Sequence, residues 1–327
     1  MPPKENQPYY KQRRVGTDVA LARALGVSLS HLHFVAKHAD QMYRRAREIR
    51  KADGSVRVTY DAFKPLKDIQ GRIRDRFLGR VVYPTYLQGC LKGRDPKSNA
   101  SLHLGARIAI GEDIKTFFDT IREELVFDVW QHLFGFGGEP ARCLTRLGVK
   151  DGVVPQGACT SPHLANLVLW REEPAVYGHF KKQGIQYSRY VDDIEVSSRH
   201  ALTREEQRSA IATIYAMLKR HNTGPKRQKH EILASGHRMV VTKLIINRRV
   251  ALPGSKRKAI RAAVHQYETM TWAPETTLTG APRVWKKTMG RVGEVKRYHP
   301  REGTALQKRL RAAKNSAQLV MIRGPRQ

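Results

Sequence analysis

An α+β fold is predicted by the order of patterns in the sequence, by its hydrophobicity and by a change of composition near residue 253. Strand and helix patterns are mixed along the chain without a regular βαβ repeat, which favours α+β architecture. Apolar residues make up 40% of the 327 residues, so the chain is globular and long enough for two or three packed subdomains. Basic helical sequence dominates after residue 253, which indicates a domain boundary there.

The first hundred residues combine helical spacing with one hairpin pattern. Gly26 interrupts the first helical stretch, so two helices are expected, which either pack on a core or form a DNA-binding helix-turn-helix. Asp53-Gly54 is typical of a hairpin turn. In chain order we expect a flexible basic arm at 1–16, helical segments from Thr17 to about Lys51, a hairpin at 52–62, a helix at 64–80 and a loop-rich segment at 84–105.

The rest of the chain has strand and helix patterns followed by a basic region. Residues 283–327 carry thirteen Lys and Arg against two Glu. The expected strands are 107–111, 185–190, 194–198, 230–234 and 238–246. The expected helices are 119–134, 139–147, 161–182 and 203–221, followed by a basic helical region at 253–315 and a mobile tail at 316–327.

The charge balance predicts a polyanionic partner. The chain has 60 Lys and Arg against 29 Asp and Glu, a formal net charge of +31. Release of counterions drives such proteins onto nucleic acid, and an acidic membrane surface is the alternative partner. There is no apolar run of about 18 residues and no signal peptide pattern, so we expect a cytoplasmic protein without membrane contact. The three cysteines show no C-x-x-C spacing, which argues against a zinc site or a disulfide framework.

Three aspartates stand out in this basic chain. Asp192 and Asp193 are adjacent in the predicted turn between two strands, and Asp113 follows an apolar strand. Aspartates are common in turns, so a purely structural role is the alternative. A strand-end aspartate and a hairpin-turn aspartate can converge, and converging carboxylates bind paired Mg²⁺ ions. Such ions support phosphoryl transfer, which would explain carboxylates in a protein that otherwise attracts phosphates.

The segments around these aspartates resemble motifs of reverse transcriptases, and of the bacterial retron type in particular. Tyr190-Val-Asp-Asp193 resembles the YxDD box, Asp113-Ile-Lys-Thr-Phe-Phe118 the first aspartate motif, and Gly152–Asn166 the PQG motif. Ser98–His103 resembles the retron NAxxH element, Phe63–Gln70 the segment after the first fingers hairpin, and Val240–Asn247 the VTG element. The chain departs from the retron pattern at Lys243, where VTG has glycine, and at Val191, where alanine is usual.

This resemblance, over about residues 30–310, implies a right-hand polymerase that copies RNA into DNA with two Mg²⁺ ions and dNTPs. The fingers would comprise residues 17–105. The palm, an antiparallel sheet with helices, would comprise residues 106–252, with finger elements near 130–165. The thumb would be the basic helical region at 253–315. Retron membership further implies a structured non-coding RNA as template and primer, a branched RNA–DNA product (msDNA), and antiphage defence, with an effector protein as a possible further partner. The alternatives are a defence-associated reverse transcriptase with another priming mode, and a catalytically silent RNA-binding protein.

The resemblance also assigns roles to single residues. Asp113, Asp192 and Asp193 would be catalytic, and with Ile114 would bind metal. The nucleotide would meet Arg57, Phe118, Gln156, Gly157 and Lys229. RNA would meet Asn99, His103, Lys256, Arg257, Lys258 and Arg261. Three alternatives stay open: Phe118 or its neighbour Phe117 in the core, Lys226 in place of Lys229, and a loop-stabilising role for Asn99 and His103.

Overall fold

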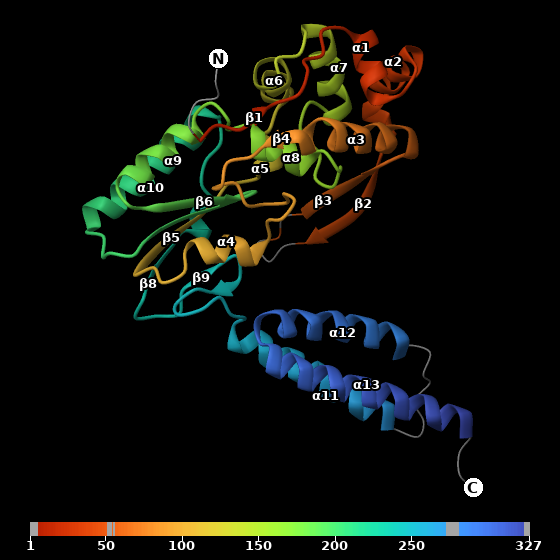
Figure 1. Ribbon diagram of the computed structural model, residues 1–327, viewed down its shortest axis with the longest axis vertical. Coiled ribbons are helices and arrows are strands. Elements are labelled where there is room, and N and C mark those ends of the chain that lie inside the picture. The colour runs from red at the N-terminus through yellow and green to blue at the C-terminus, as the bar shows by residue number, and fades with distance from the viewer. Residues whose placement is uncertain (1–5, 51–53, 55, 273–280, 324–327) are drawn as a thin grey trace. The chain divides into compact units, whose positions relative to one another are not determined.

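The computed structural model describes the chain except for residues 1–5, 51–53, 55, 273–280 and 324–327 (Figure 1). The chain divides into two compact units, Met1–His237 and Arg238–Gln327. Its mixture of helices with small antiparallel sheets confirms the α+β class.

A four-stranded antiparallel sheet forms the centre of the first unit. Its strand order is β6-β7-β5-β8, with β6 at Gln186–Tyr190, β7 at Asp193–Ser198, β5 at Ile108–Asp113 and β8 at Glu231–Ala234. Successive side chains of β6 point to opposite faces of this sheet. Tyr187 donates a hydrogen bond to Glu173 of α9 (Glu173–Lys182), whereas Ser188 donates one to Asn99 of α4 (Pro96–Leu102). Helix α9 and its neighbour α10 (Arg204–Arg220) therefore cover one face and α4 the other (Figure 1).

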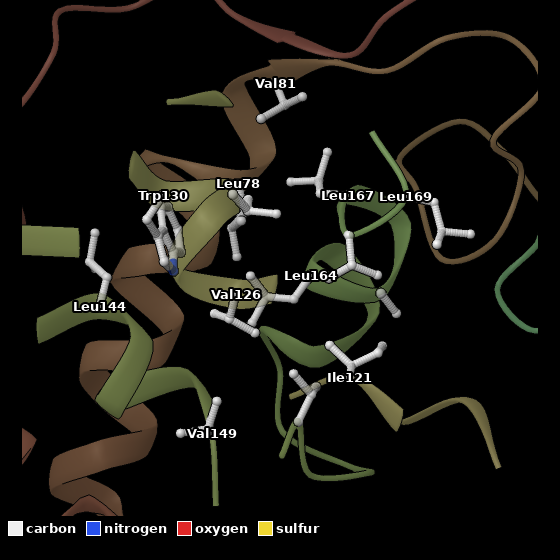
Figure 2. Close-up of a cluster of buried hydrophobic side chains, with 14 of the residues drawn as sticks. Leu78, Val81, Ile121, Val126, Trp130, Leu144, Val149, Leu164, Leu167 and Leu169 are labelled. Carbon is white, nitrogen blue, oxygen red and sulfur yellow. The ribbon is translucent and has the colours of Figure 1, made fainter. Parts of the chain in front are cut away.

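The main hydrophobic core of the first unit lies among short helices beside this sheet. Figure 2 shows Trp130, Leu144 and Leu164 within this cluster of apolar side chains, and all three are fully buried. The helices around this core are α1 (Asp18–Leu25), α2 (Leu29–Lys37), α3 (Lys64–Arg76), α5 (Phe117–Thr120), α6 (Glu123–Asp128), a π-helical turn (Val129–Leu133), α7 (Gly138–Gly148) and α8 (Ser161–Leu167). Short 3₁₀ turns lie at Ala39–Met42, Leu78–Arg80 and Arg227–Lys229.

The first hairpin begins earlier than the sequence patterns predict. Strand β2 covers Tyr43–Arg50 and pairs antiparallel with β3 (Val56–Ala62), so the helical pattern predicted up to Lys51 is wrong from Tyr43 onward. The residues of β2 after Tyr43 are exposed, so no buried face was available to impose an alternating pattern. The predicted turn at Asp53-Gly54 includes Asp53, which lies outside the described residues.

A helix also forms inside the segment that was predicted to be loop-rich. Asp95 caps α4 by accepting from the backbone N–H of Ser98, whose hydroxyl accepts from the N–H of Asp95 in return. Pro96 occupies the first turn, where its missing N–H costs nothing. The sequence Asp95-Pro-Lys-Ser98 is thus a helix-start signal that the loop prediction overlooked.

Part of the predicted N-terminal arm is attached to the first unit. Strand β1 (Tyr9–Tyr10) pairs antiparallel with β4 (Val81–Val82). The ring of Tyr10 lies 4.6 Å from that of Phe134, and the carbonyl of Val15 accepts from the N–H of Gly137. These contacts fix residues 9–15 against the core.

The second unit consists of a two-stranded hairpin and three helices. Strand β9 (Val240–Val241) pairs with β10 (Leu244–Ile245), and α11 (Gly254–Trp272), α12 (Ala281–Tyr298) and α13 (Pro300–Arg323) follow. Helix α13 extends into the segment predicted to be a mobile tail, of which 324–327 lie outside the described residues. Tyr267, Val295 and Leu310, one from each helix, are buried.

No single helix among the described residues has the length and apolar character needed to cross a membrane. Only α1 and α2 taken together, across a bend of 98°, meet that test.

Two glycines of the second unit provide a matched test of its packing. A Cβ atom on Gly303 of α13 would overlap the backbone of Lys296 in α12, whereas one on Gly290 of α12 would meet nothing within 4 Å. Gly303→Ala should therefore lower the free energy of unfolding by about 1–3 kcal/mol. Gly290→Ala should raise it by about 0.5–1 kcal/mol through helix propensity. Urea unfolding followed by circular dichroism measures both, and equal stability of the two variants would contradict the close helix crossing.

Candidate active site

The adjacent aspartates lie at the tight turn between β6 and β7. Tyr190 pairs with Asp193, so Val191 and Asp192 form a two-residue loop. Asp193 lies opposite Asp113 on β5, and the N–H of Ile114 donates to the carbonyl of Asp192 at 2.9 Å. The structure therefore brings the three predicted catalytic aspartates to one end of the sheet, from positions about 80 residues apart in sequence.

The backbone of this turn is strained and held from both sides. Val191 has a φ of 62°, a conformation that costs a β-branched residue free energy. Gly89 packs so closely against Val191 that a Cβ atom there would overlap it. On the other side, Arg189 Nη1 donates to the carbonyl of Val191 at 3.0 Å.

Arg189 is fully buried, and all of its side-chain donors are used. Its guanidinium pairs with the carboxylate of Glu173 at 2.6 and 2.8 Å. It also donates to the carbonyl oxygens of Ala165, Asn166 and Val191. Sequence reasoning missed Arg189 and Glu173. A charged residue within an otherwise buried strand was the available signal, because such a charge needs a partner.

Asp192 and Asp193 lie in an environment that disfavours their ionised form. Burial, followed by the charges of Asp192 and Asp113, raises the pKa of Asp193 to about 6. Burial also raises the pKa of Asp192. The ammonium group of Lys229 pairs with Asp113. Although burial opposes its charge, this ion pair and the nearby aspartates raise the pKa of Lys229.

These residues suit a divalent cation chemically. Among the described residues no group of three or more His, Cys, Asp or Glu side chains is arranged to hold a metal ion, and Lys229 supplies the positive charge beside Asp113. The crowded carboxylates nevertheless provide the hard oxygen ligands that Mg²⁺ prefers, and their mutual repulsion would be relieved by it. Ile114 has a buried side chain, so only its backbone carbonyl could contribute.

A cavity of about 630 Å³ opens beside the aspartates and collects most of the predicted nucleotide-binding residues. Arg57 Nε donates to Gln156 Oε1 at 2.6 Å across its wall. Asp113, Ile114 and Asp192 line it together with Arg57, Phe118, Gln156, Lys226 and Lys229. Phe118 is half-buried, whereas Phe117 belongs to the core, so the alternative that one phenylalanine is a core residue applies to Phe117.

Gly157 lies outside this cavity lining and has a different close neighbour. Its φ is 116°, and a Cβ atom there would overlap the carbonyl oxygen of Tyr60 in β3. The N–H of Tyr60 donates to the carbonyl of Gln156 at 2.7 Å. The glycine therefore lets the first hairpin approach the PQG segment, which brings Arg57 beside Gln156. The close approach that this glycine permits in the structure is to β3, and its contact with a nucleotide stays a prediction.

Asn99 and His103 form a buried network behind the aspartate hairpin. His103 Nδ1 lies 2.8 Å from Ser197 Oγ, and its Nε2 lies 2.8 Å from Ser188 Oγ. Ser188 in turn donates to Asn99 Oδ1 at 2.7 Å. Asn99 and His103 are 0% and 1% exposed, and burial lowers the pKa of His103 to about 4. This placement favours the structural alternative, in which the pair ties α4 to β6 and β7.

The predicted RNA-binding residues of the second unit are mostly engaged in ion pairs. Lys256 pairs with Glu294 at 2.5 Å, and both Arg257 and Arg261 pair with Glu302. Lys258 is exposed. RNA binding by these four residues stays a prediction, and three of them would have to share their charge with a carboxylate.

Lys243 has a left-handed backbone conformation, which glycine adopts without strain. It forms the turn of the β9–β10 hairpin with Thr242, and their φ angles are 64° and 44°. Left-handed angles at both turn residues characterise the type I′ turn, where glycine is favoured. The departure from the VTG pattern therefore places a lysine side chain at a turn position that favours glycine.

Comparison with known proteins adds independent information. No family model matches the chain. The chain is 31% identical to the retron Ec48 reverse transcriptase of Escherichia coli over 324 residues, which covers 94% of this chain and 79% of that protein. It is 29% identical to the retron Se72 reverse transcriptase of Salmonella heidelberg, over 89% of this chain and 78% of that protein. The retron Ec86 reverse transcriptase of Escherichia coli is 26% identical over 75% of this chain.

The raised pKa of Asp193 predicts how stability depends on pH without metal. The protonated carboxyl favours the folded state below about pH 4, and this contribution is lost as the pH rises through about 6. Asp193→Asn should therefore raise the free energy of unfolding at about pH 7.5 by roughly 1–3 kcal/mol, and flatten its dependence between about pH 4 and 6. Urea unfolding titrations at several pH values, with a metal chelator present, measure this free energy.

The matched control is Asp119→Asn, which changes an exposed aspartate of the nearby helix α5. It should leave both the stability and its pH dependence as in the wild type. If the free energy of unfolding of Asp193→Asn depends on pH as that of the wild type does, the crowding of the three carboxylates is contradicted.

Proposed function

The chain belongs to the retron reverse transcriptases, which are RNA-directed DNA polymerases, and from this premise we propose that the cavity beside Asp113 and Asp192 is its polymerase active site. The observation that carries the proposal is the lining of that cavity. Carboxylates that suit metal ions, an arginine that suits phosphate oxygens and an aromatic side chain meet there, although they come from three distant segments. The division of the chain into fingers, palm and thumb belongs to the same proposal.

Asp113, Asp192 and Asp193 would hold two Mg²⁺ ions, the metal that reverse transcriptases generally use. When bound, the ions supply charge neutralisation for a 3′-hydroxyl that attacks the incoming nucleotide and for the pyrophosphate that leaves. The ammonium group of Lys229 would then leave Asp113 for the phosphates, where it is placed to donate a proton to pyrophosphate. While it is paired with Asp113, its raised pKa keeps it protonated before the nucleotide binds.

Arg57 and Phe118 would select and orient the nucleotide. The guanidinium of Arg57 presents a planar fork of donors to the triphosphate, while its contact with Gln156 fixes its direction. The half-buried ring of Phe118 would lie beneath the sugar, where a 2′-hydroxyl group would clash. This favours dNTPs over ribonucleotides.

We also propose the retron reaction for this chain. A structured non-coding RNA would serve as template and primer, and synthesis from it would give a branched RNA–DNA molecule that acts in antiphage defence, together with an effector protein. Support comes from the names of the relatives and from the net charge of +31, which suits an RNA partner.

Nucleic acid that co-purifies with the protein from its native operon tests this function. The wild type should carry a short DNA joined to RNA, identified by its separate sensitivity to DNase and RNase. Asp192→Asn should carry no DNA, because the variant lacks a metal-binding carboxylate.

Asp119→Asn is the control for this substitution and should carry the same product as the wild type. RNA without DNA in all three proteins would support the RNA-binding alternative, and DNA without an RNA linkage would support another priming mode.

Phe118→Ala should relax the discrimination between sugars. Removing the ring opens space for a 2′-hydroxyl group, so incorporation of ribonucleotides relative to dNTPs should rise about ten-fold or more. Primer extension with each nucleotide class measures this ratio. Phe117→Leu changes the adjacent core residue and should lower stability while leaving the ratio unchanged. If the ratio moves equally in both variants, Phe118 is not the residue beneath the sugar.

A further inference from the structure

A second cavity of the first unit carries five arginines and no carboxylate. Its volume is about 840 Å³, larger than that of the cavity beside the aspartates. The arginines come from the N-terminal segment, from α1, from α3 and from the 3₁₀ turn that follows α3. They are Arg13, Arg14, Arg23, Arg76 and Arg80.

The frame that holds these arginines is built from packed elements. Tyr10 and Phe77 line the floor, and their rings lie 5.8 and 5.3 Å from the ring of Phe136. Arg76 Nη1 donates to the carbonyl of Ala24 at 2.6 Å, which joins α3 to α1. The cavity is therefore formed by the fold itself.

The positive charge of this cavity has no internal counterpart. Within the residues that the structure describes, none of the five guanidinium groups forms an ion pair with a carboxylate, although all five are exposed. The second unit shows the opposite arrangement, because Glu302 there pairs with both Arg257 and Arg261. Five like charges around one depression repel one another, and an external polyanion would remove that repulsion.

We propose that this cavity binds the phosphate backbone of RNA, as a docking site separate from the polymerase cavity. Guanidinium groups bind phosphate oxygens through paired donors, and a volume of about 840 Å³ is suited to a stretch of backbone with several phosphates. The proposal rests on the proposed function, which supplies RNA as the partner. The site holds the RNA, whereas the residues around Asp113 act on the nucleotide.

The test compares two triple variants that remove the same charge. Arg13→Gln/Arg23→Gln/Arg80→Gln changes the cavity and spares the arginines that contact Gly135 and Ala24. The control Arg204→Gln/Arg208→Gln/Lys219→Gln changes exposed cations of α10. The probe is a fluorescein-labelled RNA stem-loop, and its affinity for each full-length protein is measured by anisotropy over a series of salt concentrations.

The cavity variant should bind the stem-loop about ten-fold or more weakly, and its plot of log affinity against log salt should be shallower by about 2. The control variant should match the wild type. Equal weakening in both variants, or no weakening in either, would overturn the proposal. If the cavity variant still binds RNA but no longer captures an acidic protein encoded in the same operon, the proposal is overturned in favour of a protein partner.

DNA synthesis by the wild type on a short RNA template with an annealed DNA primer is measured separately. If the wild type shows no such activity, the proposed function is refuted. The salt series decides only whether the cavity is the docking site for RNA. Circular dichroism of both triple variants verifies that they are folded.

Discussion

The position of the turn that carries Asp192 depends on one buried guanidinium group. Arg189 uses all its donors inside the core, and its acceptors are Glu173 and the carbonyl oxygens of Ala165, Asn166 and Val191. Loss of one partner from such a buried pair costs about 3–5 kcal/mol, because the remaining charge stays in the core. The same bonds fix the strained turn that precedes Asp192. Two α-helices and a strand thereby converge on the backbone from which the aspartates project.

Charge is divided within the fold between a crowded acidic site and a basic exterior. Burial, together with the charges of the other two aspartates, raises the pKa of Asp193, and Lys229 offsets part of the negative charge. Some other basic residues are paired with carboxylates, as around Glu302, and some are exposed without a carboxylate, as in the arginine-lined cavity. The positive charge would attract a nucleic acid strand over a broad surface, while the carboxylates that suit a cation lie at a single point. This separation suits a polymerase of phosphate-linked chains.

The elements that were predicted correctly are those with strong local signals. The strands of the central sheet and helices α3 and α10 have clear periodicity, and the resemblance led to Asp113 and Asp192 through short motifs. Strand β2 was missed because its pairing partner, not its own pattern, determines it. Asn99 and His103 were connected to RNA by resemblance, yet their hydrogen bonds to the sheet depend on residues more than 80 positions away.

By itself, the sequence determined the family, the fold class and the identity of the three aspartates, because the spacing of motifs and the residue types can be read without a structure. Only the tertiary structure decided which cations remain available and why particular small residues are required. Gly157 illustrates this: its left-handed φ and its contact with Tyr60 exist only after a distant hairpin has folded against it. The arginine-lined cavity is a similar case, since its five side chains come from separate elements. Long-range packing brings such groups together, and no local pattern encodes their distances.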